Sequence, residues 1–489
     1  MADTWSRMPR RGRRPQALPS TPPCFGYSGW RISLHKWPTP TQMMKGKPLR
    51  VLDHQHGLDD KGHRMTISKG GPSECFVYIT LPGQIKAVTA GRFSLTRDRQ
   101  GTNVGQFVYG RSYRDNPDAV EIDPVDLQIA PRNYETAAMG GIFGSLRDAG
   151  PDHWGRRLIE RHVGKAPLNE LDYLLNSPDD RAGALGFGLN VKPPAPSRDF
   201  NKTFDLARLQ EIADAVVRDE DVETSAEREQ IEEILRLGTS MGGARPKAVV
   251  EDANGLWLAK FNRNDDRWNN ARVEHAMLQR GRECGLLTAD SRITTVADRD
   301  VLLVKRFDRE KVQGGYHRAR MVSGLTLLRA DDSHRSRDLW SYILLAEELR
   351  RVCEAPQRQA HELFKRMSFN ALISNTDDHP RNHAAIAKNK DWKLSPAYDL
   401  TPSTPISLGQ RDLALTCGDQ GRIARASNLL SQCHRFLLSR EEAIVIMKSM
   451  TNTVRDAWYH VARSAGVTEI DCKTIEGAFV YPGFGAEQI

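Results

Sequence analysis

The spacing of hydrophobic residues changes along the chain. Short apolar runs predict β-strands in the first two thirds of the sequence, at 76–81, 105–110, 248–250, 256–261 and 301–304. Elsewhere apolar residues recur every three or four positions, which predicts helices over 154–162, 204–237, 269–285, 338–352, 357–374 and 440–464. Because strands dominate before residue 310 and helices after residue 335, we predict an α+β protein with two lobes and a cleft between them.

Breaks in this pattern divide the chain into four parts. Glycine-rich turns are predicted near 140–141 and over 179–188, and the prolines at 193–196 mark a boundary. The predicted helix over 204–237 places Leu206, Leu209, Ile212 and Val216 on one face. The resulting parts are a tail (1–64), a mixed α/β module (65–195), a strand-rich lobe (196–310) and a mainly helical lobe (311–489).

The positive charge of the chain is confined to its first part. The 489 residues carry a formal net charge of +8, but residues 1–70 alone hold 13 Lys and Arg against 4 Asp and Glu. The near-neutral remainder gives no electrostatic sign of nucleic-acid binding. The tail has no sustained periodicity and many helix breakers, so we expect no stable fold in it. It is either a nucleic-acid-binding or targeting arm or, as we favour, an extension before a natural start near Met65.

The cysteines and the hydropathy of the chain indicate in which cellular compartment to expect the protein. The seven cysteines are scattered, odd in number and without a Cys-x-x-Cys pair, which argues against a disulfide framework or a zinc ribbon. No run approaches the roughly 18 apolar residues that a membrane span requires, and no secretory signal is evident. We therefore expect a soluble protein of the reducing cytoplasm.

The polar loop at 375–382 carries the most informative chemistry. Asp377 and Asn382 stand in the relation Asp-x-x-x-x-Asn, which is the spacing of the kinase catalytic loop. Such a loop can aim a carboxylate at an acceptor hydroxyl while the amide oxygen faces Mg²⁺. Asp399 follows an apolar run and a predicted hairpin, where a second Mg²⁺ carboxylate is expected. If each signal is considered by itself, the loop could equally well be a surface turn, and Asp399 could be the N-cap of a helix.

Other parts of a phosphotransfer site precede this loop in order. Lys260 lies in an apolar strand, and Glu274 lies fourteen residues later on a predicted helix, where the two could pair. The glycine-rich turn at 238–247 suits close approach to phosphates, although it is not a Walker A motif. The strand end at 304–309 could meet adenine as a hinge does. Each signal has an ordinary alternative, such as a surface ion pair or a connecting turn, but their succession is that of a kinase.

With these residues, the chain resembles the HipA family of serine/threonine kinase toxins from bacterial toxin–antitoxin systems, over roughly residues 70–470. The carrying segments are 240–247 (Ser-Met-Gly-Gly-Ala-Arg-Pro-Lys), 375–382 and 395–399. The resemblance implies a protein kinase-like fold with an added N-terminal α/β subdomain. It also implies that Asp377 is the catalytic aspartate and that Asn382 and Asp399 hold Mg²⁺. The residues it places around ATP are Gly242, Gly243, Ala244, Arg245, Pro246, Lys247, Lys260, Glu274, Lys305, Arg306, Phe307, His379, Arg381, Asn382 and Tyr398.

The resemblance also carries expectations about regulation and partners. Ser240 matches the family's autophosphorylated serine, where an added phosphate would repel ATP and inactivate the enzyme. The implied partner is a small helix-turn-helix antitoxin, through which the toxin reaches operator DNA. The implied substrate is an aminoacyl-tRNA synthetase, with glutamyl-tRNA synthetase as the first guess. Asp378 departs from the family, which has glycine there, and it is expected to add negative charge beside the metal site.

Three other functions stay open at this point. The residues Asp377, Asp378, His379 and His383 could be metal ligands of a hydrolase, although Pro380 argues against a helix that would present both histidines. The chain could instead be a catalytically idle partner in a repressor complex, although every expected catalytic residue is present. A small-molecule kinase of similar fold is the third alternative.

Overall fold

The computed structural model describes residues 73–163, 168–196, 200–202, 206–217, 245–296, 298–403 and 407–488. These residues form sheets and helices that bury several hydrophobic cores. The predicted tail at 1–64 and most of the region 218–244 lie outside the described residues, as do Ser240, Gly242, Gly243 and Ala244.

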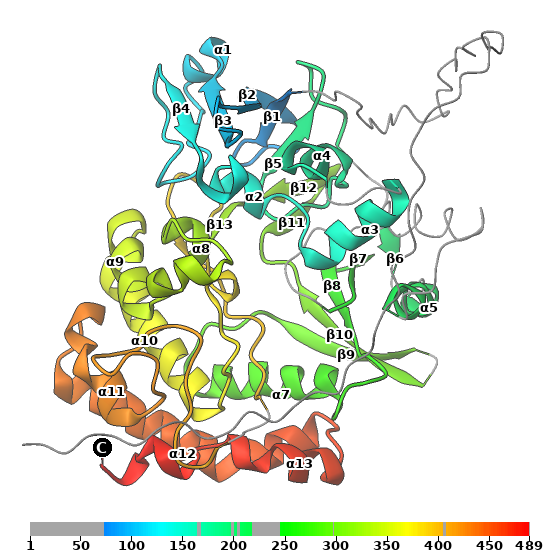
Figure 1. Cartoon of the computed structure of the whole chain (residues 1–489). Helices are drawn as coiled ribbons and strands as arrows, with labels where there is room; N and C mark the ends of the chain where they lie inside the picture. Colours follow the sequence, from blue (N-terminus) through cyan, green and yellow to red (C-terminus); the bar gives the residue numbers. More distant parts are fainter. Residues whose placement is uncertain are drawn as a thin grey trace, which may run out of the picture. The chain divides into compact units, whose positions relative to one another are not determined.

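The described chain begins with an antiparallel sheet of five strands (Figure 1). Across the sheet these are β4 (Asn133–Thr136), β3 (Asn103–Tyr109), β2 (Ala87–Arg97), β1 (Glu74–Thr80) and β5 (Leu185–Gly188). Phe107 and Tyr109, two positions apart on β3, are buried, which is typical of a sheet with one covered face. Position 105 requires glycine because a Cβ there would lie 1.9 Å from the carbonyl oxygen of Gly141, in the predicted turn.

Short helices accompany this sheet. They are α1 (Arg111–Arg114), the 3₁₀ helix η1 (Ala138–Gly140), α2 (Gly144–Asp148), α3 (His153–Val163) and α4 (Glu170–Asn176). Leu158 and Ile159 of α3 do not pack on this sheet. They share a core with Trp257 and Val301, which belong to the second sheet. The segment before residue 195 therefore contributes to the cores of both sheets.

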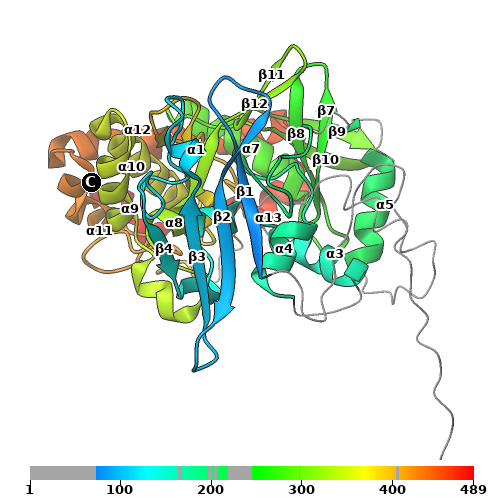
Figure 2. The same cartoon turned by 90° about the horizontal axis from the view of Figure 1, so that it is seen from above.

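The second sheet has the order β6 (Asn201–Lys202), β7 (Lys247–Asp252), β8 (Gly255–Phe261), β10 (Arg299–Lys305) and β9 (Ser291–Val296). Alternate residues of its strands enter different cores, because successive side chains point to opposite faces. Ala259 and Leu303 pack with α3 and with α5 (Leu206–Val217), whereas Leu302 packs with Ala271 of α7 (Asn270–Glu283) (Figure 2). Helix α7 thus covers the face opposite α3 and α5.

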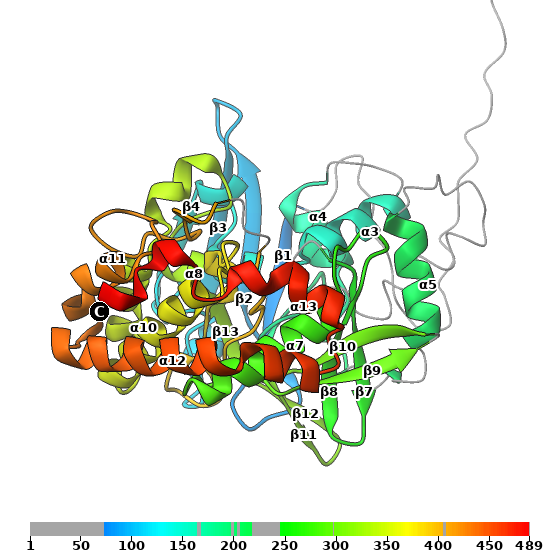
Figure 3. The ribbon, with the colours of Figure 1, turned by 90° about the horizontal axis from the view of Figure 1, so that it is seen from below.

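The rest of the chain is mainly helical. Its helices are α8 (Gly324–Leu327), η3 (His334–Leu339), α9 (Tyr342–Val352), α10 (Pro356–Leu372), η4 (Pro380–Asn382), α11 (Ala426–Ser431), η5 (Cys433–Phe436), α12 (Arg440–Ser464), α13 (Glu469–Ile475), η6 (Glu476–Ala478), η7 (Pro482–Phe484) and η8 (Ala486–Gln488). Its strands are the hairpin β11 (Arg309–Val312) and β12 (Gly315–Arg318), and the sheet of β13 (Arg320–Ser323), β14 (Ala384–Ala387) and β15 (Lys393–Leu394). Helix α12 packs along α7 and α10 (Figure 3).

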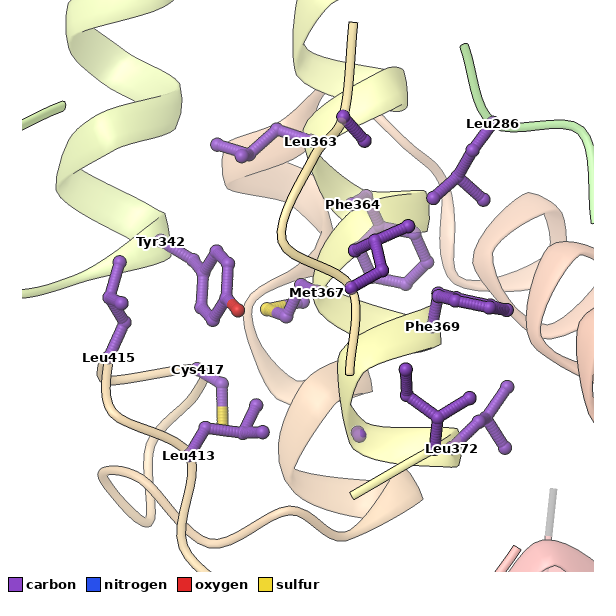
Figure 4. Packing of buried hydrophobic residues seen from close by; sticks show 14 of the residues in the cluster. Leu286, Tyr342, Leu363, Phe364, Met367, Phe369, Leu372, Leu413, Leu415 and Cys417 are labelled. Carbon is purple, nitrogen blue, oxygen red and sulfur yellow. The ribbon is translucent and has the colours of Figure 1, made fainter. Parts of the chain in front are cut away.

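Helix α10 supplies the centre of the large core. Phe364, Met367 and Phe369 of this helix are fully buried, and Tyr342 at the start of α9 lies in the same cluster (Figure 4). Helix α10 ends at Leu372, just before the polar loop that the sequence singled out. The tightly packed helix therefore fixes the position of the loop's first residue. None of the helices in the described ranges is long and apolar enough to cross a membrane.

The predicted elements agree with the structure except in a few places. The α+β class is confirmed, as are the helices that correspond to α3, α7, α9, α10 and α12. Residues 185–188, predicted within a turn, form strand β5. Strand β9 and the β11–β12 hairpin were not predicted, because charged residues interrupt their apolar patterns. The structure describes helix α5 only to Val217, and the side chains of Ile212 and Val216 lie outside the described set.

Candidate active site

Lys260 lies at the centre of a charged cluster between the second sheet and the helical region. Its Nζ is 2.7 Å from Oε1 of Glu274 on α7 and 2.7 Å from Oδ1 of Asp399. Strand β8 carries Lys260 between buried apolar neighbours, so the side chain has one direction in which to extend. The structure thus contains the predicted pair of Lys260 and Glu274, and it adds Asp399 from 139 residues further along the chain.

The charges of this cluster depend on one another. Burial opposes the charged form of Lys260, but the carboxylates of Asp399 and Glu274 outweigh it and raise the lysine pKa. Burial would also raise the pKa of Asp399, yet Lys260 holds it down at about 2. Burial prevails at Glu274, whose pKa is raised despite Lys260. The side chain of Asp399 is 34% exposed, so a cation arriving from solvent can reach its carboxylate.

The backbone at Asp399 has an uncommon conformation. Its φ of 60° lies in the left-handed region, which a residue other than glycine or asparagine adopts at some energetic cost. Asn375 holds this segment, since its side-chain amide donates to the carbonyl oxygen of Asp399 at 3.3 Å and to Oδ1 of Asn370 at 3.1 Å. Asn375 is itself buried. The start of the polar loop is therefore tied directly to the residue that carries the second carboxylate.

The loop at 375–382 folds as a tight turn that leaves Asp377 at the surface. The backbone N–H of His379 and the side-chain amide of Asn382 both donate to the carbonyl oxygen of Asp377, at 2.8 and 3.3 Å. The carboxylate of Asp377 has no hydrogen-bond partner among the described residues. Burial is the main reason that the pKa of Asp377 is raised, with His379 opposing the shift and Asp399 adding to it. An available carboxylate with a raised pKa has the character of a general base.

Asp378 does not face the candidate metal site. Its side chain is 1% exposed, and its Oδ2 accepts hydrogen bonds from the hydroxyl of Tyr342 and from Nε2 of His383, the latter at 2.8 Å. Asn370 donates in turn to the Tyr342 hydroxyl at 3.3 Å. The charge of Asp378 still acts at the site, since it adds to the raised pKa of Asp377. A buried carboxylate needs such partners, so Asp378 also anchors the turn to α9 and α10.

The donor set suits Mg²⁺ but offers few protein ligands. Asp399 and Asn382 supply a carboxylate and an amide, which are the hard oxygen donors that Mg²⁺ takes while keeping several waters. Among the described residues no group of three or more His, Cys, Asp and Glu side chains is arranged to hold a metal. The hydrolase alternative also loses two of its four ligands, because Asp378 and His383 pair with each other inside the protein. The four residues therefore do not form a joint zinc-type site in this structure.

The predicted phosphate-loop residues that the structure describes are engaged with neighbouring carboxylates. Arg245 forms a two-pronged pair with Asp266, with both N–O distances at 2.8 Å. Lys247 is buried, and its Nζ lies 2.8 Å from Oδ2 of Asp152, just before α3. Pro246 precedes it and is buried. Asp152 is a residue that the sequence analysis missed, since its partner is 95 positions away and no local pattern signals it.

The predicted hinge residues differ in what surrounds them. The guanidinium of Arg306 is buried and donates to the carbonyl oxygens of Asp180 and Arg181 and to the carboxylate of Asp308. Lys305 and Phe307 are partly exposed. The Phe307 ring lies 5.7 Å from the Tyr398 ring, one residue before Asp399. Of the three hinge residues, only Lys305 and Phe307 therefore have side chains that are partly exposed.

The two remaining predicted nucleotide residues flank the loop. The guanidinium of Arg381 is held by Asp332, at 3.1 and 2.7 Å, and its carbonyl oxygen accepts from the Tyr398 hydroxyl at 2.6 Å. His379 is half-buried, and its Nδ1 has no partner among the described residues. In this structure Arg381 therefore braces the loop, whereas His379 keeps a ring nitrogen available.

Comparison with known proteins agrees with this geometry. The model of the HipA N-terminal domain matches residues 85–188, and that of the HipA-like C-terminal domain matches residues 239–458. Together they cover about two thirds of the sequence. The chain belongs to the HipA family. The first match lies over the five-stranded sheet, and the second spans the Lys260 cluster and the polar loop.

Individual relatives of this HipA-family chain are distant. A curated Haemophilus influenzae protein whose name marks it as a kinase candidate is 26% identical over 189 residues, which are 34% of this chain. The chain spans about half the length of that relative, 54%. A Shewanella oneidensis MR-1 toxin–antitoxin structure, of HipA with HipB and its operator DNA, aligns with a TM-score of 0.56 at 15% identity, over 84% of this chain and 97% of its own. That likeness establishes the fold. The Helicobacter pylori proinflammatory kinase CtkA reaches a TM-score of only 0.33, over 51% of this chain and 93% of its own at 15% identity, which is too low to support an argument.

Proposed function

We propose that this chain is an ATP- and Mg²⁺-dependent serine/threonine protein kinase. The observation that carries the proposal is the contact of Lys260 with both Glu274 and Asp399, at 2.7 Å each, beside the available carboxylate of Asp377. A strand lysine paired with a helix glutamate and set against a metal-binding aspartate is the arrangement that protein kinases require. We take the second sheet with α7 as one lobe and the helical region as the other.

Each residue has a distinct part in the proposed reaction. Asp377 accepts the proton of the attacking hydroxyl, and its exposed position leaves room for a protein substrate. Asp399 and Asn382 hold Mg²⁺, which when bound neutralises charge on the phosphates. Lys260 binds phosphate oxygens, and Glu274 keeps the lysine aimed at them. Asn375 maintains the spacing between the loop and Asp399 through its 3.3 Å hydrogen bond.

We further propose that the kinase is the toxin of a toxin–antitoxin pair in the cytoplasm. The supporting relative is the Shewanella oneidensis HipA, whose solved complex contains HipB and operator DNA. By analogy, a helix-turn-helix antitoxin would bind this chain and mediate its contact with DNA. The protein substrate is an aminoacyl-tRNA synthetase, with the glutamyl enzyme as the first candidate. Phosphorylation of Ser240 would inactivate the kinase by repelling ATP.

The proposal is tested by incubating the full chain with labelled ATP and Mg²⁺ in a cell lysate, followed by mass spectrometry. The wild type is expected to label one protein on serine, and Asp377→Gln and Asp399→Ala to label none. Asp118→Asn is a matched control, because Asp118 is exposed and lies in the segment 65–195, outside the two proposed lobes. Label that persists in Asp377→Gln, or that appears only on a small molecule, would refute the protein kinase assignment.

Growth provides an independent test of the toxin role. Expression of the wild type without its neighbouring gene should arrest growth, and Asp399→Ala should relieve the arrest at equal protein abundance. Arrest by the Asp399→Ala variant would show that toxicity does not depend on phosphotransfer.

A further inference from the structure

A groove lies beside the predicted hinge residues Lys305, Arg306 and Phe307. Its volume is about 1300 Å³. Five segments line it, namely 254–256, 285–290, 305–311, 354–365 and 386–396. Lys260, Glu274, Asp377, Asn382 and Asp399 are not among its lining residues. The groove is therefore separate from the candidate active site, although the hinge forms a wall of it.

Basic side chains without partners converge on this groove. Lys305, Arg358, Lys388 and Lys393 come from three lining segments, and none has a carboxylate within salt-bridge distance in the described part of the chain. Four acidic residues also line the groove. Asp290 and Glu362 form ion pairs, at 3.2 and 3.0 Å, whereas Glu310 and Glu354 have no ion-pair partner among the described residues. The groove thus has unpaired positive charge in excess of unpaired negative charge.

An apolar side chain is displayed beside these charges. Leu287 is 54% exposed, although its backbone is fixed by hydrogen bonds to Glu362 and Ala397. Leu287 therefore offers an apolar side chain at a fixed position beside the basic residues. Three further apolar residues, Ile386, Leu394 and Pro396, also line the groove.

The same segment connects the groove to the candidate active site. The backbone of Ala397 donates to the carbonyl oxygen of Leu287 at 2.7 Å, and the backbone of Ala289 donates to that of Ala397 at 2.9 Å. Ala397 is two residues before Asp399. Phe307, which lines the groove, also contacts the ring of Tyr398. A ligand in the groove would therefore touch elements that position Asp399.

We propose that this groove binds an extended protein segment that carries several carboxylates and at least one large apolar side chain. The carboxylates pair with Lys305, Arg358, Lys388 and Lys393, and the apolar side chain packs on Leu287. A nucleic acid fits less well, because Glu310 and Glu354 would repel a continuous phosphate backbone. Phe307, which lines the groove, is already packed against Tyr398, so it is a poor stacking platform for bases. The segment belongs to the substrate protein, an assignment that rests on the proposed kinase function.

The groove is tested by fluorescence anisotropy with the full chain and no ATP. The probe is a fluorescein-labelled peptide of Glu-Glu-Leu repeats, compared with one of Gln-Gln-Leu repeats and with labelled oligouridylate. Lys388→Glu combined with Lys393→Glu should weaken binding of the acidic peptide about tenfold, because two attractions become repulsions. Leu287→Gln should weaken it by a smaller factor.

Matched variants make the outcome decisive. Lys448→Glu with Lys473→Glu reverses two exposed lysines outside the groove and should leave binding unchanged. Asp377→Gln should also bind normally, because binding to the groove does not require phosphotransfer. Peptide binding by a wild-type chain that shows no phosphotransfer would refute the kinase function and leave the groove proposal intact. Equal binding by wild type and the Lys388/Lys393 variant, no binding of the acidic peptide by wild type, or a stronger preference for oligouridylate would overturn the proposal.

Discussion

Two charged clusters of this protein each combine basic and acidic side chains but differ in how completely they are closed. Lys260, Glu274 and Asp399 form the first, in which the Asp399 side chain keeps 34% of its surface exposed. Arg306, Asp308 and Arg309 form the second, just after β10, and their side chains are at most 2% exposed. In the first cluster a ligand can replace one of the contacts between side chains, whereas the second cluster is closed to ligands.

The closed cluster links two parts of the fold that are far apart in the sequence, the turn at Gly183 and the chain just after β10. Asp308 accepts hydrogen bonds from Arg306, from Arg309 and from the backbone N–H of Gly183, at 2.7 to 3.0 Å. Burial alone would raise the pKa of Asp308, but the two arginines hold it well below its usual range. Because all acceptors are used, this cluster stabilises the junction instead of binding a ligand.

The largest expected difference between the clusters is in activity. Asp377→Asn, beside the open cluster, should lower kcat by about 10³-fold, because a general base contributes on the order of 10² to 10⁴. Its melting temperature should stay near that of the wild type, since the carboxylate has no protein partner among the described residues. Single-turnover phosphotransfer and thermal melts of Asp377→Asn and the control Asp118→Asn provide the measurement. A stability loss as large as the activity loss would contradict the comparison.

Substitutions in the closed cluster should mainly lower the stability of the fold. Asp308→Asn leaves two buried guanidinium groups without a carboxylate and should cost about 3–5 kcal/mol of folding free energy. The matched control is Asp265→Asn, whose carboxylate pairs with Arg263 but is 68% exposed, and it should cost less than about 1 kcal/mol. Denaturant titration monitored by tryptophan fluorescence measures both. Similar costs for the two variants would show that burial does not separate the clusters.

Asp378 combines features of the two clusters. Its carboxylate is buried, as in the closed cluster, but it lies in the proposed catalytic loop. Asp378→Asn should cost about 1–3 kcal/mol of stability, because it disturbs the hydrogen bonds from Tyr342 and His383 to a buried carboxylate. Tyr342→Phe removes the hydroxyl that donates to Asp378 and accepts from Asn370, but it keeps the buried carboxylate and its hydrogen bond with His383, so it should cost less. The KM for ATP should change less than kcat in both variants, since the network positions Asp377. A rise in KM with unchanged kcat would count against this positioning role.

The smallest effect concerns pH. The pKa of Asp377 is raised above the ordinary 3.8 of an aspartate, so activity should fall, as pH decreases, at a higher pH than an unperturbed aspartate would dictate. Asp399, with a pKa of about 2, stays ionised throughout that range. His379→Gln removes a group that lowers the Asp377 pKa and should move the acidic limb of the kcat/KM profile to higher pH. A limb that moves to lower pH would assign it to another group.

Local sequence pattern predicted a large part of the fold and the composition of the site. The periodicity of 440–464 matches α12, and the apolar run with Lys260 matches β8. Each signal is carried by residues only a few positions apart, where the backbone repeat fixes which side chains share a face. Partners that are far apart in sequence, such as Asp152 for Lys247, left no local signal and were missed.

The sequence by itself determined which residue types could perform phosphotransfer and in what order they occur, because spacing along a strand, a helix or a turn is a local property. Only the tertiary structure decided which charges are available. Asp377 and Asp378 are adjacent in sequence, yet one carboxylate lies at the surface and the other is buried between Tyr342 and His383. Neighbouring side chains in a turn point in different directions, and packing from distant elements determines which of them meets a partner and which meets solvent.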